Sequence, residues 1–198
     1  MKIGLFGGSF NPIHNGHLGL AGAAARQFGL EQVLFVPCRV PPHKPSPHLA
    51  PAIHRLEMCR IATEGVPGFL VSDIEQQMPE PSYTLDTLTQ LRRRHPGDEW
   101  FLIIGADMLL TFQKWHRWQE FSGLATLLAA ARQPGQRQAL EYKARELAAF
   151  GLKAQVFDLE VIELSSTRIR SRIAHGEGTE GLLPAGVREY IDVHSLYL

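Results

Sequence analysis

Residues 2–17 read KIGLFGGSFNPIHNGH, a short apolar run that passes through two glycines into a turn and then a helix. The run at 2–6 predicts a buried strand, and the small and apolar residues beyond the turn predict a helix over 17–28. We expect this helix to cover a sheet with four side chains at helical spacing: Leu18, Ala21, Ala25 and Phe28. A strand, a glycine turn and a helix in this order are typical of a parallel sheet.

The rest of the chain repeats this alternation of strands and helices. Further strands are expected at 32–36, 69–71, 100–104 and 126–130, and further helices at 54–64, 84–94, 138–150, 167–175 and 185–193. The pattern predicts an α/β fold, a Rossmann-like doubly wound parallel sheet with flanking helices. Because no internal repeat or linker interrupts it, we expect a single domain over 1–198. The proline-rich segment 37–51 predicts an extended loop at the carboxyl edge of the sheet, where open α/β sheets bind ligands.

Composition narrows the class of protein. The chain has 198 residues, 44% of them hydrophobic, and its 20 Lys and Arg balance its 20 Asp and Glu. A zero net charge argues against general binding to nucleic acid or to anionic membranes. No uncharged apolar run is long enough to span a bilayer and the first residues lack a signal-peptide pattern, so we expect a cytoplasmic protein. The two cysteines, Cys38 and Cys59, are too few for a disulfide framework and predict reduced thiols.

The turn after the first strand carries most of the functional information. Gly7 and Gly8 would allow positive-φ turns and close approach of the backbone to a ligand, and the following helix offers free N–H groups to an anion. His14 and His17 are three residues apart, so both imidazoles should emerge on one side, where they could donate to phosphate oxygens. The same spacing would fit half of a metal site, whose further ligands would have to come from Cys38, His43 or His54.

A second candidate anion site lies near the other end, where residues 164–173 read LSSTRIRSRI. A serine-serine-threonine cluster before a helix predicts an N-cap, with hydroxyls and free N–H groups at the positive end of the helix dipole. Three cations follow: Arg168, Arg170 and Arg172. An ordinary capped helix with a solvated basic face would show the same pattern. Two anion sites far apart in the sequence would suit a triphosphate that is held from both sides.

The middle of the chain holds candidate groups for a second substrate. Lys44 ends the segment PPHK and would contribute a point charge for one phosphate. In the segment SYT, either Ser82 or Thr84 should cap the helix over 84–94 and leave backbone N–H groups free for a carboxylate. Trp115 offers a flat face to a cationic pyridinium ring, although a tryptophan taken in isolation is more often a core residue.

These motifs carry a family resemblance. GGSFNPIHNGH at 7–17 resembles the GG[ST]FDPxHxGH signature of the bacterial nicotinate-nucleotide adenylyltransferases, within the HxGH nucleotidyltransferase superfamily. LSSTRIR at 164–170 is similar to the superfamily's [IL]SSTx[IV]R motif, and PPHK, SYT, GAD at 105–107 and the tryptophan after it also have counterparts. The resemblance extends over nearly the whole chain. One departure is Asn11, where the family more often has Asp, so a role that needs a carboxylate there is in doubt.

The resemblance implies adenylyl transfer from ATP to nicotinate mononucleotide, giving nicotinate adenine dinucleotide and pyrophosphate in a step of NAD biosynthesis. It assigns catalysis to His14 and His17. The implied ATP-binding residues are Gly7, Gly8, Ser9, Phe10, His14, Gly16, His17, Gly105, Asp107, Arg132, Ser166, Thr167 and Arg170. The implied mononucleotide-binding residues are Lys44, Ser82, Tyr83, Thr84 and Trp115. Mg²⁺ is expected to arrive bound to ATP, with no dedicated metal site in the protein.

Three alternatives stay open at this point. A sister enzyme that acts on phosphopantetheine or on a small alcohol phosphate would share the glycine and histidine motifs, although PPHK, SYT and Trp115 argue against it. An enzyme that prefers nicotinamide mononucleotide or accepts both mononucleotides would differ in one backbone orientation. A silent module that senses ATP or NAD precursors would bind ATP without releasing pyrophosphate. The sequence leaves the oligomeric state open, a homo-oligomer included.

Overall fold

The computed structural model describes residues 1–41, 48–131, 133, 135–159 and 164–198. Two of the predicted site residues, Lys44 and Arg132, lie outside these ranges. Within them, no helix is long and apolar enough to cross a membrane.

Six strands form one sheet in the order β3-β2-β1-β4-β5-β6. The strands are β1 (Lys2–Gly8), β2 (Gln32–Pro37), β3 (Phe69–Val71), β4 (Glu99–Ile104), β5 (Thr126–Ala131) and β6 (Lys153–Asp158). The pairs β1–β4, β4–β5 and β5–β6 run parallel, with Ile3 opposite Trp100 and Leu127 opposite Ala154. The α/β fold with a parallel sheet is therefore confirmed. Five strands lie within two residues of their predicted bounds, and β6 is a strand that the sequence analysis missed.

Seven α-helices accompany the sheet in the described residues. They are α1 (Asn15–Phe28), α2 (Ala52–Thr63), α3 (Thr84–Arg94), α4 (Ala106–Leu110), α5 (Gln136–Ala148), α6 (Ser166–Ala174) and α7 (Ala185–Val193). Short 3-10 helices lie at η1 (Ile74–Gln77), η2 (Phe112–Lys114) and η3 (Trp118–Phe121). All six predicted helices are present within two residues of the expected bounds, and only α4 among the α-helices was not predicted.

The chain divides into two compact units, each built from segments that are discontinuous in the sequence. Unit 1 comprises Met1–Gly7, Leu20–Leu34 and Tyr83–Val161, and unit 2 comprises Gly8–Gly19, Phe35–Ser82 and Ile162–Leu198. The expectation of a single domain stays a prediction.

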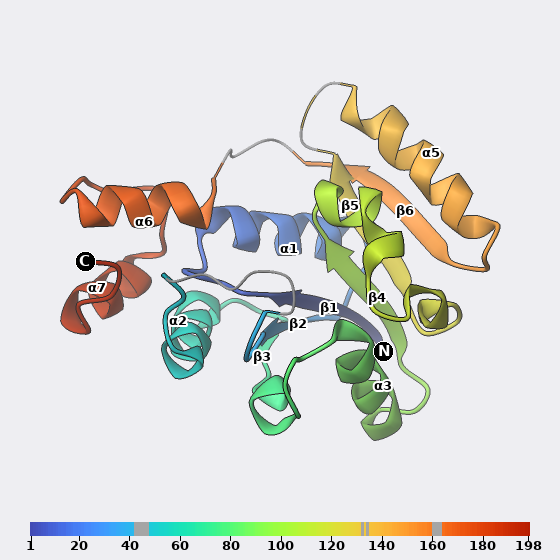
Figure 1. The fold of residues 1–198 in the computed structure, drawn as a ribbon, viewed down its shortest axis with the longest axis horizontal. Coiled ribbons are helices and arrows are strands. Elements are labelled where there is room, and N and C mark those ends of the chain that lie inside the picture. The colour runs from blue at the N-terminus through green and yellow to red at the C-terminus, as the bar shows by residue number, and fades with distance from the viewer. Residues whose placement is uncertain (42–47, 132, 134, 160–163) are drawn as a thin grey trace. The chain divides into compact units, whose positions relative to one another are not determined.

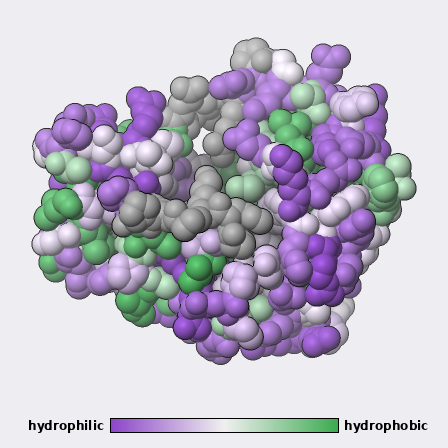
Figure 2. Space-filling model, in the orientation of Figure 1, coloured by the Kyte–Doolittle hydropathy of each residue, from purple (hydrophilic) through white to green (hydrophobic). Residues whose placement is uncertain are grey.

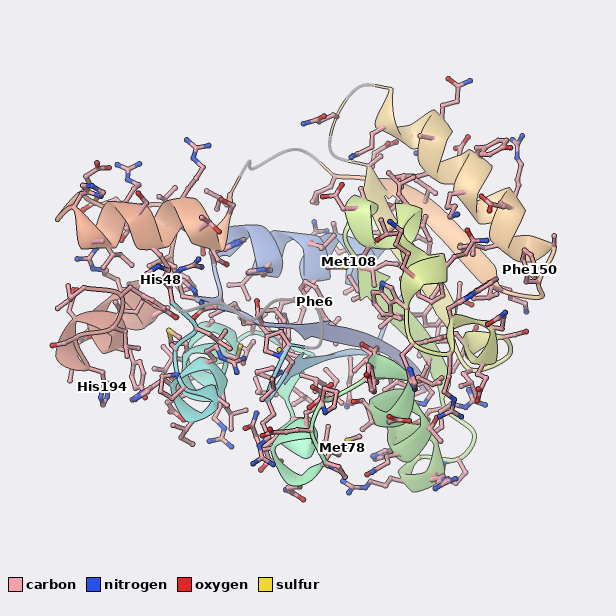
Figure 3. The ribbon with its side chains drawn as sticks, in the orientation of Figure 1. Phe6, His48, Met78, Met108, Phe150 and His194 are labelled. Carbon is pink, nitrogen blue, oxygen red and sulfur yellow. The ribbon has the colours of Figure 1, made fainter. Side chains whose placement is uncertain are left out.

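Each unit has its own packing. In unit 1, α5 packs along β6 (Figure 1), and Phe150, labelled in Figure 3, lies edge-on against Trp118 with 5.1 Å between ring centroids. In unit 2, α2 packs against β3 and α7. Figure 2 shows hydrophilic side chains over α6, as its arginines lead one to expect.

The buried face of α1 differs from the predicted one. Of the four side chains expected to cover the sheet, only Ala21 is buried, and the buried residues of α1 are Leu20, Ala21 and Ala24. Leu18 and Ala25 are half-buried instead. The helix carries leucines and alanines around most of its circumference, so the apolar pattern alone does not define one buried stripe.

Candidate active site

The two glycines at the end of β1 do not form a positive-φ turn. Gly7 and Gly8 are the last residues of β1, and the Gly8 carbonyl accepts a hydrogen bond from the Cys38 N–H at 2.9 Å. The positive φ falls on Phe10, at 44°, so the predicted turn at the glycines was wrong. A Cβ on Gly8 would lie 3.2 Å from the Phe10 ring, which explains why a residue without a side chain stands there.

Phe10 packs against the aromatic rings of the site. The residue is 1% exposed, and its ring contacts those of His17 and Phe35, with centroid distances of 5.1 and 5.9 Å. The ring meets His17 edge-on, at an interplanar angle of 76°. The Phe10 ring therefore supports His17 and presents no exposed surface to a nucleotide.

His14 and His17 lie face to face at the start of α1. Their rings stack with 3.6 Å between centroids and 21° between planes, which agrees with the prediction that both emerge on one side. The His14 backbone N–H donates to His17 Nδ1 at 3.2 Å. With Nδ1 acting as an acceptor, a neutral His17 ring carries its proton on Nε2. His17 can then donate to a phosphate oxygen without first being protonated.

Gly16 lets these rings come together. A Cβ at this position would lie 3.1 Å from His14 Nδ1 and 3.3 Å from Leu164 Cβ. A side chain at Gly16 would therefore force the His14 ring or Leu164 to shift by a few tenths of an ångström.

Three backbone carbonyls of the loop between β1 and α1 are held by donor side chains. The Ser9 carbonyl accepts from Arg55 Nη1 at 2.8 Å, and the Asn11 carbonyl accepts from Arg170 Nη1 at 2.8 Å. The Pro12 carbonyl accepts from Ser166 Oγ at 3.0 Å. Because these oxygens are occupied by donors, their partial negative charges are compensated beside the place where an anion would bind.

The last two of these contacts join the two predicted anion sites. Ser166 and Arg170 belong to α6, and Ser166 is 154 residues from Pro12 in the sequence. The Ser165 side chain caps α6 by accepting from the Arg168 N–H at 3.2 Å, as predicted for this cluster. Arg170 Nη2 lies 3.5 Å from Thr167 Oγ1. Unit 2 thus brings the imidazoles, hydroxyls and a guanidinium into one region.

Asn11, the residue that departs from the family signature, makes three side-chain hydrogen bonds. Asn11 is 3% exposed, and its Oδ1 accepts from the Ala50 N–H at 3.0 Å and from the Tyr197 hydroxyl at 2.8 Å. Its Nδ2 donates to the His48 carbonyl at 2.9 Å, which a carboxylate could not do. Burial raises the pKa of Tyr197 far above its usual value, so the phenol stays protonated and remains a donor.

In unit 1, the start of α3 lacks a side-chain cap. Tyr83 is the N-cap residue, and no side chain accepts from the first turn, so the expectation that Ser82 or Thr84 caps this helix was wrong. Ser82, which ends the Phe35–Ser82 segment of unit 2, is 4% exposed, and its Oγ has no hydrogen-bond partner in the part of the chain that the structure describes. A buried hydroxyl without a hydrogen-bond partner lowers the stability of the protein by about 1–3 kcal/mol. A ligand atom that bonds to this hydroxyl could recover that free energy.

Trp115 is half-buried and packs against two phenylalanines. Its ring lies 5.0 Å from that of Phe112 and 6.1 Å from that of Phe121. The sequence alone did not indicate that the adjacent His116 would stack on Tyr83, with 4.1 Å between centroids and 20° between planes. The His116 ring thus lies at the start of α3, while Trp115 packs with Phe112 and Phe121.

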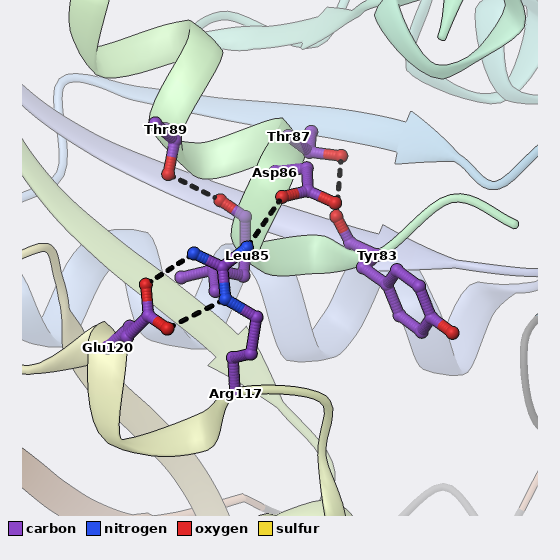
Figure 4. Close-up of polar contacts among 7 residues, drawn as sticks. All are labelled: Tyr83, Leu85, Asp86, Thr87, Thr89, Arg117 and Glu120. Atoms are coloured by element: carbon purple, nitrogen blue, oxygen red, sulfur yellow. Dashed lines mark hydrogen bonds and ion pairs between the residues drawn. The ribbon is translucent and has the colours of Figure 1, made fainter. Parts of the chain in front are cut away.

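Arg117 connects the loop that follows Trp115 to α3, through the contacts that Figure 4 shows. It adopts the left-handed conformation, with φ of 53°, and makes two hydrogen bonds to Glu120 at 2.6 and 2.7 Å. Its Nη1 lies 3.8 Å from Asp86 Oδ1 in the first turn of α3. The bonds from Arg117 lower the pKa of Glu120, although solvent screens this exposed network. The network helps to position the loop that carries Trp115.

Two more predicted residues of unit 1 follow β4. Gly105 is the N-cap residue of α4, and no described atom lies within 4 Å of a Cβ placed on it. Asp107 is exposed in the first turn of α4. Both positions are open, as a contact with adenosine would require.

The two cysteines are buried, and we expect their thiols to be protonated and unreactive near neutral pH. Burial raises the pKa of Cys38 to about 11 and that of Cys59 further still. At pH 8 only about one Cys38 thiol in a thousand is then ionised. We expect native protein at pH 8 to resist iodoacetamide at both thiols and protein unfolded in guanidinium to react at both, as counted by mass spectrometry. Rapid labelling of Cys38 in the native protein would contradict this assignment.

Sequence and structure comparisons connect the chain with known proteins. The profile of the cytidylyltransferase-like family matches residues 5–172. Nicotinate-nucleotide adenylyltransferase of Bacillus subtilis is 38% identical over 196 residues, covering 99% of this chain and 98% of the relative. A probable nicotinate-nucleotide adenylyltransferase of Bacillus pumilus is 41% identical, with the same coverage. The structure of Plasmodium falciparum nicotinic acid mononucleotide adenylyltransferase complexed with NaAD has a TM-score of 0.78 at 17% identity, covering 99% of this chain and 97% of that one.

Proposed function

The chain belongs to the nicotinate-nucleotide adenylyltransferases of the cytidylyltransferase-like family, and we propose that it transfers the adenylyl group of ATP to nicotinate mononucleotide. A phosphate oxygen of the mononucleotide attacks the α-phosphorus of ATP in line. The new P–O bond forms as the bond from the α-phosphorus to the α,β-bridging oxygen breaks, and pyrophosphate leaves with that electron pair. The attacking phosphate is already an anion near neutral pH, so no protein nucleophile is needed.

The observation that carries this proposal is the arrangement of donors in unit 2. His14 and His17 are stacked at the positive end of α1, and three carbonyls of the adjoining loop are occupied by Arg55, Arg170 and Ser166. Charge accumulates on the pyrophosphate oxygens as the bond breaks, and fixed donors stabilise that charge most when they need no reorganisation. We assign this role to His17 and Arg170, with Ser9, Thr167 and the loop backbone as further phosphate contacts.

The acceptor assignment rests on the start of α3 and its aromatic neighbours. A helix N-terminus without a side-chain cap offers N–H groups to a carboxylate, and Trp115 offers a half-exposed ring to a pyridinium. Nicotinamide would place its own NH₂ against the same donors, and a mismatch of this kind can lower kcat/KM by about a hundredfold or more. We therefore propose that the enzyme prefers the acid to the amide. On the family resemblance we assign Ser82, Tyr83 and Thr84 to mononucleotide binding as well.

The remaining assignments rest on the family resemblance. Gly105 and Asp107 are proposed to contact adenosine, with Asp107 accepting from a ribose hydroxyl. Outside the described residues, Lys44 is a proposed contact of the mononucleotide phosphate and Arg132 a proposed contact of ATP. Mg²⁺ enters as the Mg²⁺ complex of ATP. We propose triphosphate oxygens and water as the ligands of the ion, because Mg²⁺ usually keeps several waters and binds substrate phosphates.

The test is pyrophosphate release from Mg²⁺ATP by the purified protein, with nicotinate mononucleotide, nicotinamide mononucleotide and phosphopantetheine compared side by side. We expect kcat/KM with the acid to exceed that with the amide by about a hundredfold or more. Equal rates with acid and amide would retain the chemistry and reject the specificity. ATP binding with no release from any acceptor would reject the enzyme in favour of a nucleotide-binding module.

A further inference from the structure

A fully buried arginine in unit 2 binds backbone from three separate segments. Arg55, in the first turn of α2, is 0% exposed. Its Nη1 donates to the Ser9 carbonyl at 2.8 Å, its Nη2 to the Arg39 carbonyl at 2.8 Å, and its Nε to the Ala50 carbonyl at 2.9 Å. A planar guanidinium is rigid, so its three donors set the relative positions of these three peptide groups.

These segments include both candidate substrate loops. Ser9 belongs to the loop between β1 and α1, next to the histidines. Arg39 and Ala50 stand on either side of Lys44 in the sequence, and both are held by the same side chain. Burying the Arg55 guanidinium carries a large desolvation cost, because a buried cation without well-aligned acceptors is strongly unfavourable. An arginine at a position that an apolar side chain could otherwise fill calls for a reason.

Asn11 makes a second, independent set of hydrogen bonds to the backbone near Ala50. Its side chain accepts from the Ala50 N–H and donates to the His48 carbonyl. Figure 3 labels His48. The end of the segment that follows Lys44 is therefore held from α2 by Arg55 and from the phosphate loop by Asn11. At the other end of this segment, next to Arg39, the Cys38 N–H donates to the Gly8 carbonyl. This hydrogen bond holds Cys38 close to the end of β1.

We propose that Arg55 is a positioning residue of the transfer reaction, which holds the Arg39 and Ala50 peptide groups against Ser9 of the ATP phosphate loop, with Asn11 as its partner. The inference rests on the proposed function for the roles of the ATP loop and of the sequence between Arg39 and Ala50. Two phosphates that repel each other must be aligned for in-line attack, and a shift of about 1 Å can cost about a hundredfold in rate. One rigid side chain that binds all three peptide groups opposes such a shift at these three residues.

The principal test compares Arg55→Lys with the wild type and with Met58→Ala. Lysine keeps the positive charge but loses the three-way donor geometry. Met58 is equally buried on α2 and serves as a matched control for loss of stability. We expect Arg55→Lys to raise the KM for nicotinate mononucleotide about tenfold or more and to lower kcat, while Met58→Ala lowers the Tm and leaves both constants within about twofold. Constants within that range for folded Arg55→Lys, or an equal rise for Met58→Ala, would overturn the proposal.

A measurement without substrate separates this inference from the proposed function. Hydrogen exchange of the apo proteins should be about tenfold faster in Arg55→Lys at the Cys38 and Ala50 amides and unchanged there in Met58→Ala. If the wild type releases no pyrophosphate, the proposed function fails, and exchange still decides whether Arg55 holds these segments. If Arg55→Lys does not fold, Asn11→Ala tests the second tie. A KM for the mononucleotide within about twofold of the wild type would then count against the proposal.

Discussion

Replacing His17 by alanine is expected to lower kcat for pyrophosphate release by about 10²–10³-fold, because removal of one fixed donor to a developing negative charge has a cost of this size. The His14 N–H holds His17 Nδ1 as an acceptor, so a neutral ring carries its proton on Nε2, the atom that we propose donates to the phosphates. The interaction strengthens as charge moves onto the leaving pyrophosphate. The KM for ATP should therefore change much less than kcat, as steady-state kinetics at saturating mononucleotide would measure.

The control for this variant is His175→Ala. His175 is an exposed histidine just past the end of α6 in the same unit, and it should keep kcat within about twofold of the wild type. Circular dichroism should show the same fold for both variants. If His17→Ala retained kcat within about threefold, a change of less than about 1 kcal/mol in the barrier, His17 would not stabilise the leaving group.

The fold was predictable because its elements are local and strongly patterned. Buried parallel strands read as short apolar runs, and β1, β4 and β5 are buried along most of their length. β6 was missed because it pairs on one side only and its residues KAQVFD are mostly polar or half-exposed. The face of α1 was misassigned for the opposite reason, since small and apolar residues surround most of that helix.

The site was predictable only where a motif places its residues close together in the sequence. The stacked histidines and the Ser165 cap depend on spacings of three residues, which the sequence displays directly. The glycine turn was misjudged because the Phe10 ring, and not φ, demands Gly8. Tertiary contacts left no such local signal, so Tyr197 and His116 were missed.

Arg55 did leave a signal that could have revealed it. It lies at helical spacing with Met58, Cys59 and Ala62, all of them buried on α2. A charged residue on an apolar face is either paired with specific acceptors or not part of a core. The sequence could therefore have marked Arg55 as unusual, but only the structure identifies the three carbonyls that it binds.

Arg170→Ala is expected to lower kcat/KM for ATP by about 10²–10³-fold, because the variant loses two functions at once. Arg170 Nη1 occupies the Asn11 carbonyl, and Nη2, 3.5 Å from Thr167 Oγ1, is available to a phosphate. The freed Asn11 carbonyl would then present its partial negative charge near the incoming triphosphate. Steady-state kinetics with varied Mg²⁺ATP, together with calorimetric titration of ATP, would measure the loss.

Arg170→Lys and Arg172→Ala show which property of Arg170 matters. Lysine keeps the charge but cannot reach the carbonyl and a phosphate with one planar fork, so Arg170→Lys should recover only part of the lost kcat/KM. Arg172, on the same helix, pairs with Glu177 at 3.3 Å, so its removal takes away the same charge without touching the phosphate loop. If Arg172→Ala lost as much as Arg170→Ala, the effect would come from the general positive field of α6, and the carbonyl contact to Asn11 would not be the cause.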